Sequence, residues 1–272
     1  MKRWIAVWLG VWLSLAMARN DVPSCYQALK LHEADTTPDK ALFILVDQTT
    51  PLDKPMMIYT YKTMMRFLRN GNSVSIASFS SNANGKYTEA AFSGRLEHLL
   101  PQEATRDISK KILRKYKGCM NAQYRYAKKK ATKALVRVLK GANKSLPHSD
   151  ILKSLSDISE HLIKPKPAKE KTVLLVSDMM EHSSITSFYH KGRLKRIDTA
   201  KELAKVKQSG FVADFDGARV YVIGAGATSN KKSYRDSKTL KRLSDFWTAY
   251  FKIANAKLQA IGTPMLLDDI AP

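Results

Sequence analysis

The sequence predicts an α/β fold: an open, doubly wound, mostly parallel sheet with helices on both faces, plus a basic helical insertion. Two observations lead to this prediction. Four short runs of the 272-residue chain are rich in apolar residues, three of them almost without interruption, and stretches with helical periodicity separate them. Strands that are apolar on both faces belong in the middle of a parallel sheet, because a sheet with one wet face alternates apolar and polar residues.

The predicted strands follow the apolar runs. The four buried strands are "ALFILV" at 41–46, "SVSIASF" at 73–79, "TVLLVS" at 172–177 and "RVYVIG" at 219–224. A fifth segment, "YTEAAFSG" at 87–94, alternates more regularly, which is typical of an edge strand.

Helices are predicted between the strands. An apolar stripe at helical spacing follows residue 51, and a second stripe runs from residue 240 to 261, so we expect a long helix to close the domain. The segment 190–210 is also predicted to be helical and basic. The residues of the first stripe are Met57, Tyr61, Met64, Met65 and Leu68, and those of the second are Leu240, Leu243, Trp247, Tyr250, Phe251, Ala254, Leu258 and Ile261.

The chain begins with a segment typical of an export signal. Lys2 and Arg3 precede an apolar run from Trp4 to Ala18, which closes with the small-x-small pattern of a cleavage site. The run is shorter than the roughly 20 residues that span a bilayer. We therefore expect residues 1–18 to be a signal peptide cleaved near Ala18, and the protein to be periplasmic or secreted. An uncleaved anchor is the alternative.

We divide the rest of the chain into an N-terminal extension at 19–39 and one domain at 40–272, which carries the basic helical insertion at about 105–145. The two cysteines of the sequence are Cys25, in the extension, and Cys119, in the insertion. After export into an oxidising compartment, an even pair of cysteines predicts a disulfide.

Positive charge dominates the composition. The chain has 46 Lys and Arg against 24 Asp and Glu, and residues 106–144 alone hold fourteen basic residues and one acid. This excess of positive charge favours an acidic envelope polymer or a membrane surface as a partner, and we expect nucleic acid less than these two. The alternative is a solvated helix face that binds nothing. The candidate anion-binding residues are Lys110, Lys111, Arg114, Lys115, Lys128, Lys129 and Lys130.

Two of the predicted core strands end in aspartate. Asp47 follows the first strand and Asp178 follows the strand at 172–177. In a parallel sheet both carboxylates lie at the same edge, and a hard divalent cation is the natural way to neutralise them, with Thr49 as a further oxygen ligand. The alternative is that Asp47 caps the following helix and Asp178 starts a turn.

These residues resemble the von Willebrand factor A family, whose pattern is Asp-x-Ser-x-Ser after the first strand, a distant Thr, and an Asp after the fourth strand. "DQTTP" supplies Asp47 and Thr49, and Pro51 stands in the place of the second serine. "SDMM" supplies Asp178, and Met179 replaces a glycine. The resemblance extends from the first strand to the closing helix.

The segment "LPHSDILKSLSDISEHL" at 146–162 resembles the part of the family that brings the distant threonine, which places Ser149 in that role. The resemblance implies a Mg²⁺ or Mn²⁺ ion held directly by Thr49 and Ser149. It further implies that Asp47 and Asp178 reach the ion mainly through water, and that one position stays open to an acidic side chain of a partner.

We therefore expect an exported, non-enzymatic adhesion or scaffold module that binds a protein partner within a cell-envelope assembly. The alternative is an anion-binding protein that uses its basic helices to engage nucleic acid or acidic envelope polymers. A hydrolase is a third possibility, because two carboxylates converge near His182. However, the sequence has no Gly-x-Ser-x-Gly elbow and no phosphate loop.

Overall fold

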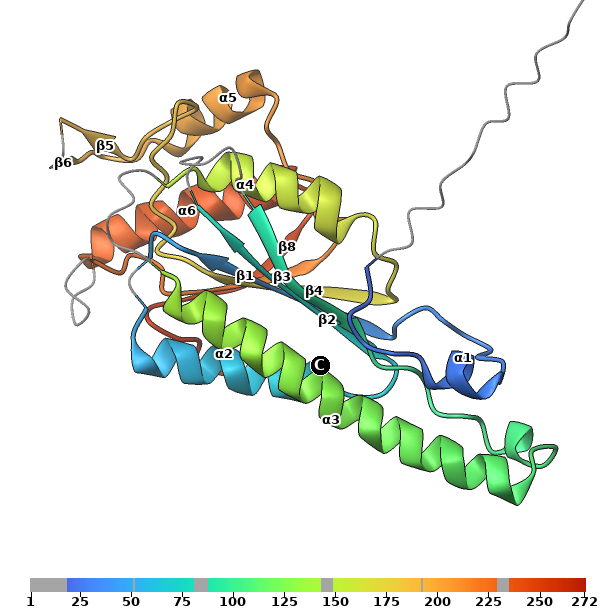
Figure 1. Ribbon diagram of the computed structural model, residues 1–272. Coiled ribbons are helices and arrows are strands. Elements are labelled where there is room, and N and C mark those ends of the chain that lie inside the picture. Colours follow the sequence, from blue (N-terminus) through green and yellow to red (C-terminus); the bar gives the residue numbers. More distant parts are fainter. Residues whose placement is uncertain (1–18, 51, 81–87, 143–148, 192, 229–234) are drawn as a thin grey trace, which may run out of the picture.

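The computed structural model describes residues 19–50, 52–80, 88–142, 149–191, 193–228 and 235–272 (Figure 1). The expected signal peptide and Pro51 lie outside these residues. The sheet strands are β1 (Lys40–Asp47), β2 (Asn72–Phe79), β3 (Thr88–Arg95), β4 (Glu170–Val176), β7 (Arg219–Ile223) and β8 (Lys257–Gly262), and a separate hairpin contains β5 (Tyr189–His190) and β6 (Arg193–Leu194). The α-helices are α1 (Cys25–Leu29), α2 (Lys54–Phe67), α3 (Lys110–Lys140), α4 (Ile151–Ile158), α5 (Thr199–Ser209) and α6 (Ser237–Ile253); a 3₁₀ turn lies at Glu103–Thr105 and a π-helical turn at Ser159–Ile163.

The six strands form one sheet in the order β3-β2-β1-β4-β7-β8. All neighbouring strands are parallel except β2 and β3, which are antiparallel. Counted among the sheet strands alone, this order is 3-2-1-4-5-6, the arrangement of doubly wound, Rossmann-like sheets. The predicted fold class is therefore confirmed, and the predicted edge strand at 87–94 forms β3 at one border of the sheet.

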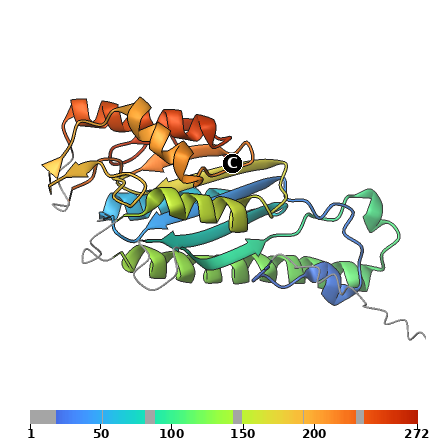
Figure 2. The same cartoon turned by 90° about the horizontal axis from the view of Figure 1, so that it is seen from above.

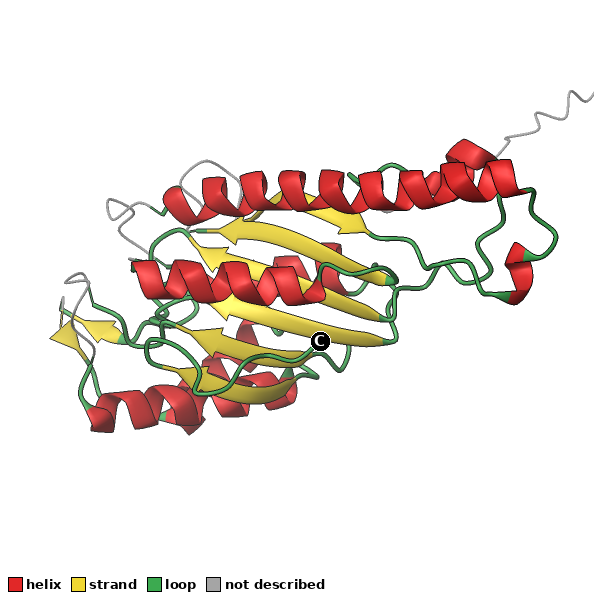
Figure 3. Cartoon of the chain, turned by 90° about the horizontal axis from the view of Figure 1, so that it is seen from below, coloured by secondary structure: helices red, strands yellow, loops and turns green. Residues whose placement is uncertain are grey.

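Helices cover both faces of the sheet. Helices α2 and α3 lie across one face (Figure 3), and α4 and α6 cover the other, with α5 packed on α6 (Figure 1). The side chains of β1 alternate between the two cores: Leu42 and Ile44 belong to the α2–α3 side, and Phe43 and Leu45 to the opposite side. Because both cores are apolar, β1 is apolar at successive positions, as its sequence predicts.

The end of the chain differs from the prediction. Helix α6 stops at Ile253, and residues 257–262 form β8 along β7, although Leu258 and Ile261 continue the helical spacing. Asn255, with a φ of 49°, turns the chain out of the helix. The pairing of β8 with β7 joins segments far apart in the sequence, which a local periodicity cannot reveal. The segment 190–210 is likewise helical only in α5, since the β5–β6 hairpin occupies its first part.

Helix α3 is continuous over 31 residues within the region predicted to hold basic helices. Its C-terminal part packs on the sheet through buried residues such as Ala127, Ala131 and Leu135. Its N-terminal part runs beyond the sheet beside α1 (Figures 1 and 2). The predicted disulfide is present there and joins Cys25 to Cys119, 94 residues apart in the sequence. It ties the N-terminal extension to the overhanging part of α3.

Along the described parts of the chain, no helix combines the length and the apolar character that crossing a bilayer requires.

Candidate functional site

The two aspartates lie at the point where the strand order reverses. Asp47 ends β1, and Asp178 follows the end of β4, the parallel neighbour of β1. The register pairs Val46 with Val176, so the two chains leave the sheet side by side. In doubly wound sheets, ligands bind in the crevice outside the carboxyl ends of the strands at this switch point. We call the edge formed by Asp47, Asp178 and their contacts the carboxyl rim.

Asp47 is fully buried, and donors of this chain surround its carboxylate. Its Oδ1 accepts a hydrogen bond from the backbone N of Thr49 at 2.9 Å and lies 2.6 Å from Thr49 Oγ1. Its Oδ2 accepts hydrogen bonds from Ser177 Oγ at 2.7 Å and from Ser149 Oγ at 3.3 Å. Burial raises the pKa of Asp47, although the hydrogen bonds from Thr49 and Ser177 act in the opposite direction.

Ser149 reaches the rim from the loop before α4. Its Oγ lies 3.2 Å from Thr49 Oγ1, and its backbone carbonyl accepts a hydrogen bond from the N of His182 at 2.9 Å. The second contact joins the loop before α4 to the loop after β4. The structure therefore brings Thr49 and Ser149 together on the carboxylate of Asp47.

Asp178 lies beside the same group. Its backbone N donates to Thr50 Oγ1 at 2.9 Å, and its Oδ1 accepts a hydrogen bond from the N of Met180 at 2.9 Å. Burial, and then the negative charge of Asp47, raise the pKa of Asp178 to about 7. The two carboxylates are thus close enough for the charge of Asp47 to make Asp178 harder to ionise.

The turn after β4 has the backbone that a glycine favours. Met179, which stands where the von Willebrand pattern has glycine, adopts a φ of 60°. Such a left-handed conformation costs a residue with a side chain on the order of 1–2 kcal/mol. The side chain of Met179 is fully buried, and its carbonyl accepts a hydrogen bond from Trp247 Nε1 at 2.9 Å. These contacts hold the turn in place.

The structure separates the alternative roles of the two aspartates. Asp53 is the cap of α2, because its side chain accepts a hydrogen bond from the N of Met56 at 2.9 Å. The alternative that Asp47 caps this helix is therefore wrong. The hydrogen bond from Met180 to Asp178 does make Asp178 part of a turn, as the alternative for that residue proposed.

Sequence reasoning missed two residues of the rim. The positive charge of Arg235 lowers the pKa of Asp178, and the pKa of Tyr189 is raised first by burial and then by the charge of Asp178. Arg235 lies just before α6, and Tyr189 lies in the β5–β6 hairpin. Neither belongs to a motif and both are far from Asp47 and Asp178 in the sequence, so no local signal could have placed them beside these aspartates.

Within the described ranges, no three or more His, Cys, Asp or Glu side chains gather into a group that could hold a metal ion. A cation at the carboxyl rim would therefore depend on two carboxylates and on hydroxyl oxygens. Such an all-oxygen donor set suits Mg²⁺ or Mn²⁺ better than softer metals. The hydroxyls of Thr49 and Ser149 can act as ligands of the cation, because a hydroxyl that donates a hydrogen bond to a carboxylate still has oxygen lone pairs.

The predicted anion-binding residues all lie on α3 and are exposed. Four of them are in its overhanging N-terminal part, and the other three, at 128–130, are nearer its middle. Lys130 Nζ lies 5.4 Å from the centre of the Tyr126 ring, a cation–π distance. These residues belong to a different element from the carboxyl rim, so the sequence predicted two separate candidate sites.

No family model matches the chain, and no curated protein matches it. The solved structures it resembles include an aerotolerance-related membrane protein from Bacteroides fragilis NCTC 9343 with multiple mutations to serines (11% identity, TM-score 0.35, covering 82% of this chain and 92% of that one). Another is the pilus adhesin SpaC from Lactobacillus rhamnosus GG (13%, 0.37, 82% of this chain), of which the match spans 31%. A third is the TFIIH p34 N-terminal domain (14%, 0.36, 82% and 91%). At these TM-scores we base no argument on the likeness.

Proposed function

We propose that this protein is a non-enzymatic binding module whose carboxyl rim holds Mg²⁺ or Mn²⁺. Asp47, Thr49, Ser149 and Asp178 would provide the oxygen ligands, directly or through water. A bound divalent cation would neutralise the two carboxylates and present a coordination position to a partner. The partner would be a protein that offers an acidic side chain, as the resemblance to von Willebrand factor A domains implies.

One observation carries this proposal: two acids and two hydroxyls from three distant parts of the sequence converge at the switch point of the sheet. Thr49 and Ser149 contact Asp47, and Asp178 is near enough for its pKa to respond to the charge of Asp47. Two neighbouring carboxylates with raised pKa values disfavour the charged state unless a cation joins them. The arrangement suits a cation better than it suits a purely structural cap.

The cellular setting belongs to the same proposal. An export signal at 1–18 would deliver the chain to an oxidising compartment, where disulfides such as Cys25–Cys119 persist. We propose a periplasmic or secreted protein that works within a cell-envelope assembly.

The direct test is a calorimetric titration of the protein with Mg²⁺ and with Mn²⁺, repeated with the variants Asp47→Ala and Ser149→Ala. Asp245→Ala is the matched control, because Asp245 is an exposed acid of α6 whose ion-pair partner among the described residues is Lys241. We expect cation binding by the wild type and by the control, and its loss in both rim variants. A wild type that takes up neither ion at millimolar concentration would refute the proposal.

A second candidate function rests on α3. The helix contains twelve Lys and Arg and no acid, and among the described residues only Arg137 of this helix forms an ion pair, with Glu89. Unpaired exposed cations on one long helix suit an anionic polymer. A pull-down against DNA and acidic polymers over a range of salt tests this function, since counterion release makes such binding fall steeply with salt. Binding that needs Lys128, Lys129 and Lys130 but ignores Asp47 would favour this candidate over the first.

A further inference from the structure

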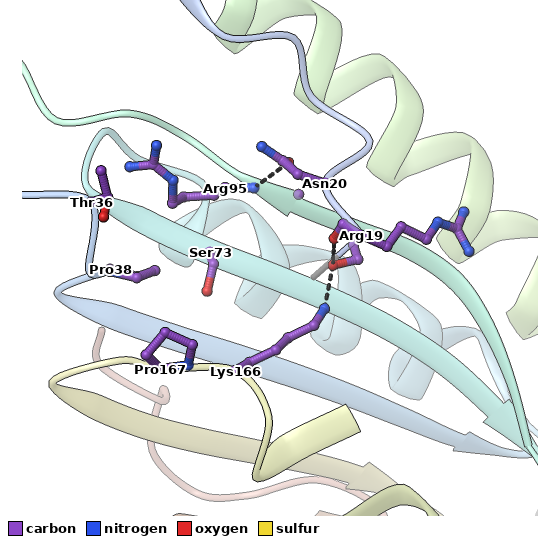
Figure 4. Close-up of a pocket in the computed structure, with 10 residues that line it drawn as sticks. Arg19, Asn20, Thr36, Pro38, Ser73, Arg95, Lys166 and Pro167 are labelled. Atoms are coloured by element: carbon purple, nitrogen blue, oxygen red, sulfur yellow. Dashed lines mark hydrogen bonds between the residues drawn. The ribbon is translucent and has the colours of Figure 1, made fainter. Parts of the chain in front are cut away.

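A small pocket lies on the α4–α6 side of the sheet, where β2 and β3 are not covered by a helix. Ser73 and Ser75 face this side, because Val74 and Ile76 point into the core beneath α2 and α3. The cavity has a volume of about 180 Å³. Figure 4 shows its walls, which come from the N-terminal segment, the loop before β1, strands β2 and β3, and the linker before β4. The lining residues are Arg19, Asn20, Thr36, Pro38, Ser73, Ser93, Gly94, Arg95, Lys166 and Pro167.

Lys166 is the central polar group of this pocket. It stands between Pro165 and Pro167, and two prolines restrict the backbone on both sides of it, so its side chain enters from a defined direction. Its Nζ donates to Ser75 Oγ at 2.8 Å and also to Ser93 Oγ. An ammonium has three N–H donors, and no third partner stands among the described residues.

The charges around the pocket are balanced except at Lys166. Arg19 pairs with Asp21 at 2.8 Å, and Arg95 pairs with Glu33 through two hydrogen bonds of 2.6 and 2.7 Å. Lys166 has no carboxylate within ion-pair distance in the described part of the chain, and burial lowers its pKa to about 8, with Asp21 acting against this effect. The pocket therefore carries one uncompensated positive charge, which suits a single negative charge.

We propose that this pocket binds a small aliphatic monocarboxylate. The carboxylate pairs with Lys166 Nζ and takes a hydrogen bond from Ser73, which lies between Lys166 and Pro38 in Figure 4. The aliphatic part lies against the rings of Pro38 and Pro167. This site is separate from the carboxyl rim and does not depend on the function proposed for it.

The size of the cavity limits the ligand. A pocket with a volume of about 180 Å³ suits a small ligand of only a few non-hydrogen atoms. Butyrate has that size and carries one negative charge at neutral pH. Its neutral isostere butyramide has the same shape, and phosphate has more charge without the aliphatic part. These three molecules therefore separate recognition of shape, charge and carboxylate.

The experiment follows the backbone amide signals of Ser73 and Gly94 by NMR while each probe is added to the oxidised full chain. We expect butyrate to shift both signals to saturation, and Lys166→Met to weaken its binding roughly 10-fold or more, as the loss of a charged hydrogen bond implies. The matched control is Lys164→Met, because Lys164 lies in the same linker but is exposed and pairs with Glu160. It should bind butyrate as the wild type does.

Several results would overturn the proposal. Equal binding of butyramide would show that the pocket does not recognise a carboxylate, and tighter binding of phosphate would show that it is a site for inorganic anions. The blocked peptide Ac-Ala-Glu-Ala-NH₂ provides the remaining comparison, since its glutamate offers the same chemistry from a protein. Binding of this peptide without binding of butyrate would assign the pocket to a protein partner. If Lys166→Met does not fold, Ser73→Ala replaces it, and an unchanged affinity in that variant would also count against the proposal.

Discussion

Replacement of Asp178 by asparagine gives the sharpest test of the electrostatics at the carboxyl rim. Asparagine has nearly the same shape and keeps the oxygen that accepts the hydrogen bond from Met180, but it carries no charge. In the absence of divalent cations, we expect Asp178→Asn to be more stable than the wild type above neutral pH. Most substitutions of a native residue lower the stability of a protein, so an increase in stability would be unusual.

The magnitude follows from the pKa of Asp178, which rises from 3.8 to about 7 on folding. Each unit corresponds to about 1.4 kcal/mol, so ionising this group in the folded protein costs up to about 4 kcal/mol. Because the folded pKa is raised, the free energy of unfolding is highest below pH 3.8. It falls as the pH rises towards 7, and it is constant above that. The advantage of Asp178→Asn should therefore be near zero at pH 4 and largest at pH 8.

Urea denaturation in EDTA at pH 4, 6 and 8 measures this difference. The same series with excess Mg²⁺ tests the proposed cation, which should stabilise the wild type and leave the variant unchanged. A variant that is less stable than the wild type at pH 8 in EDTA would refute the reasoning, because burial and the charge of Asp47 would then not destabilise the ionised form of Asp178 in the folded protein.

Three further predictions concern other parts of the fold. Reduction of the Cys25–Cys119 bond, which closes a loop of 94 residues, should lower the free energy of unfolding by about 4–5 kcal/mol in the chain-entropy picture, and urea denaturation with and without dithiothreitol measures it. Burial alone would raise the pKa of Glu202, but hydrogen bonds that include those from Lys195 and Lys205 lower it to about 2. Glu202→Gln should therefore lower the free energy of unfolding by about 3 kcal/mol at pH 7. This difference from the wild type should disappear as the pH falls from about 5 to 2. Within helices and strands, glycine is usually less stabilising than alanine by about 1 kcal/mol. Because φ is 60° at position 179, Met179→Gly should nevertheless be at least as stable as Met179→Ala. A glycine variant that is clearly less stable in thermal denaturation would contradict this prediction.

The parts of the fold that were predictable are those with a local physical signature. The run at 41–46 is apolar at successive positions because β1 is covered on both faces, and the alternation at 87–94 marks the border strand β3. The helical stripe after residue 51 corresponds to α2. In contrast, β8 was predicted as helix, because the spacing of Leu258 and Ile261 fits a helix as well as a strand. The segment becomes a strand because it pairs with β7, which is far away in the sequence.

The candidate site shows the same division. Asp47 and Asp178 were predictable at the same edge, because a parallel sheet brings the carboxyl ends of its strands to one edge. That their strands are direct neighbours is shown by the structure. The contact of Ser149 with Asp47 was expected only from the family resemblance. Arg235 could not be predicted at all, since its place near Asp178 depends on tertiary contacts such as the hydrogen bond from its backbone N to the carbonyl of Gly226.

The sequence by itself predicted which segments are buried strands, that two acids end strands of one parallel sheet, and that the two cysteines pair, because each of these follows from local pattern or from counting. The tertiary structure alone decided which hydroxyls reach Asp47, how the charge of Asp178 is perturbed, and that Lys166 is left without a carboxylate in its pocket. These properties depend on distances between residues far apart in the chain, and burial and Coulomb energies change steeply over such distances.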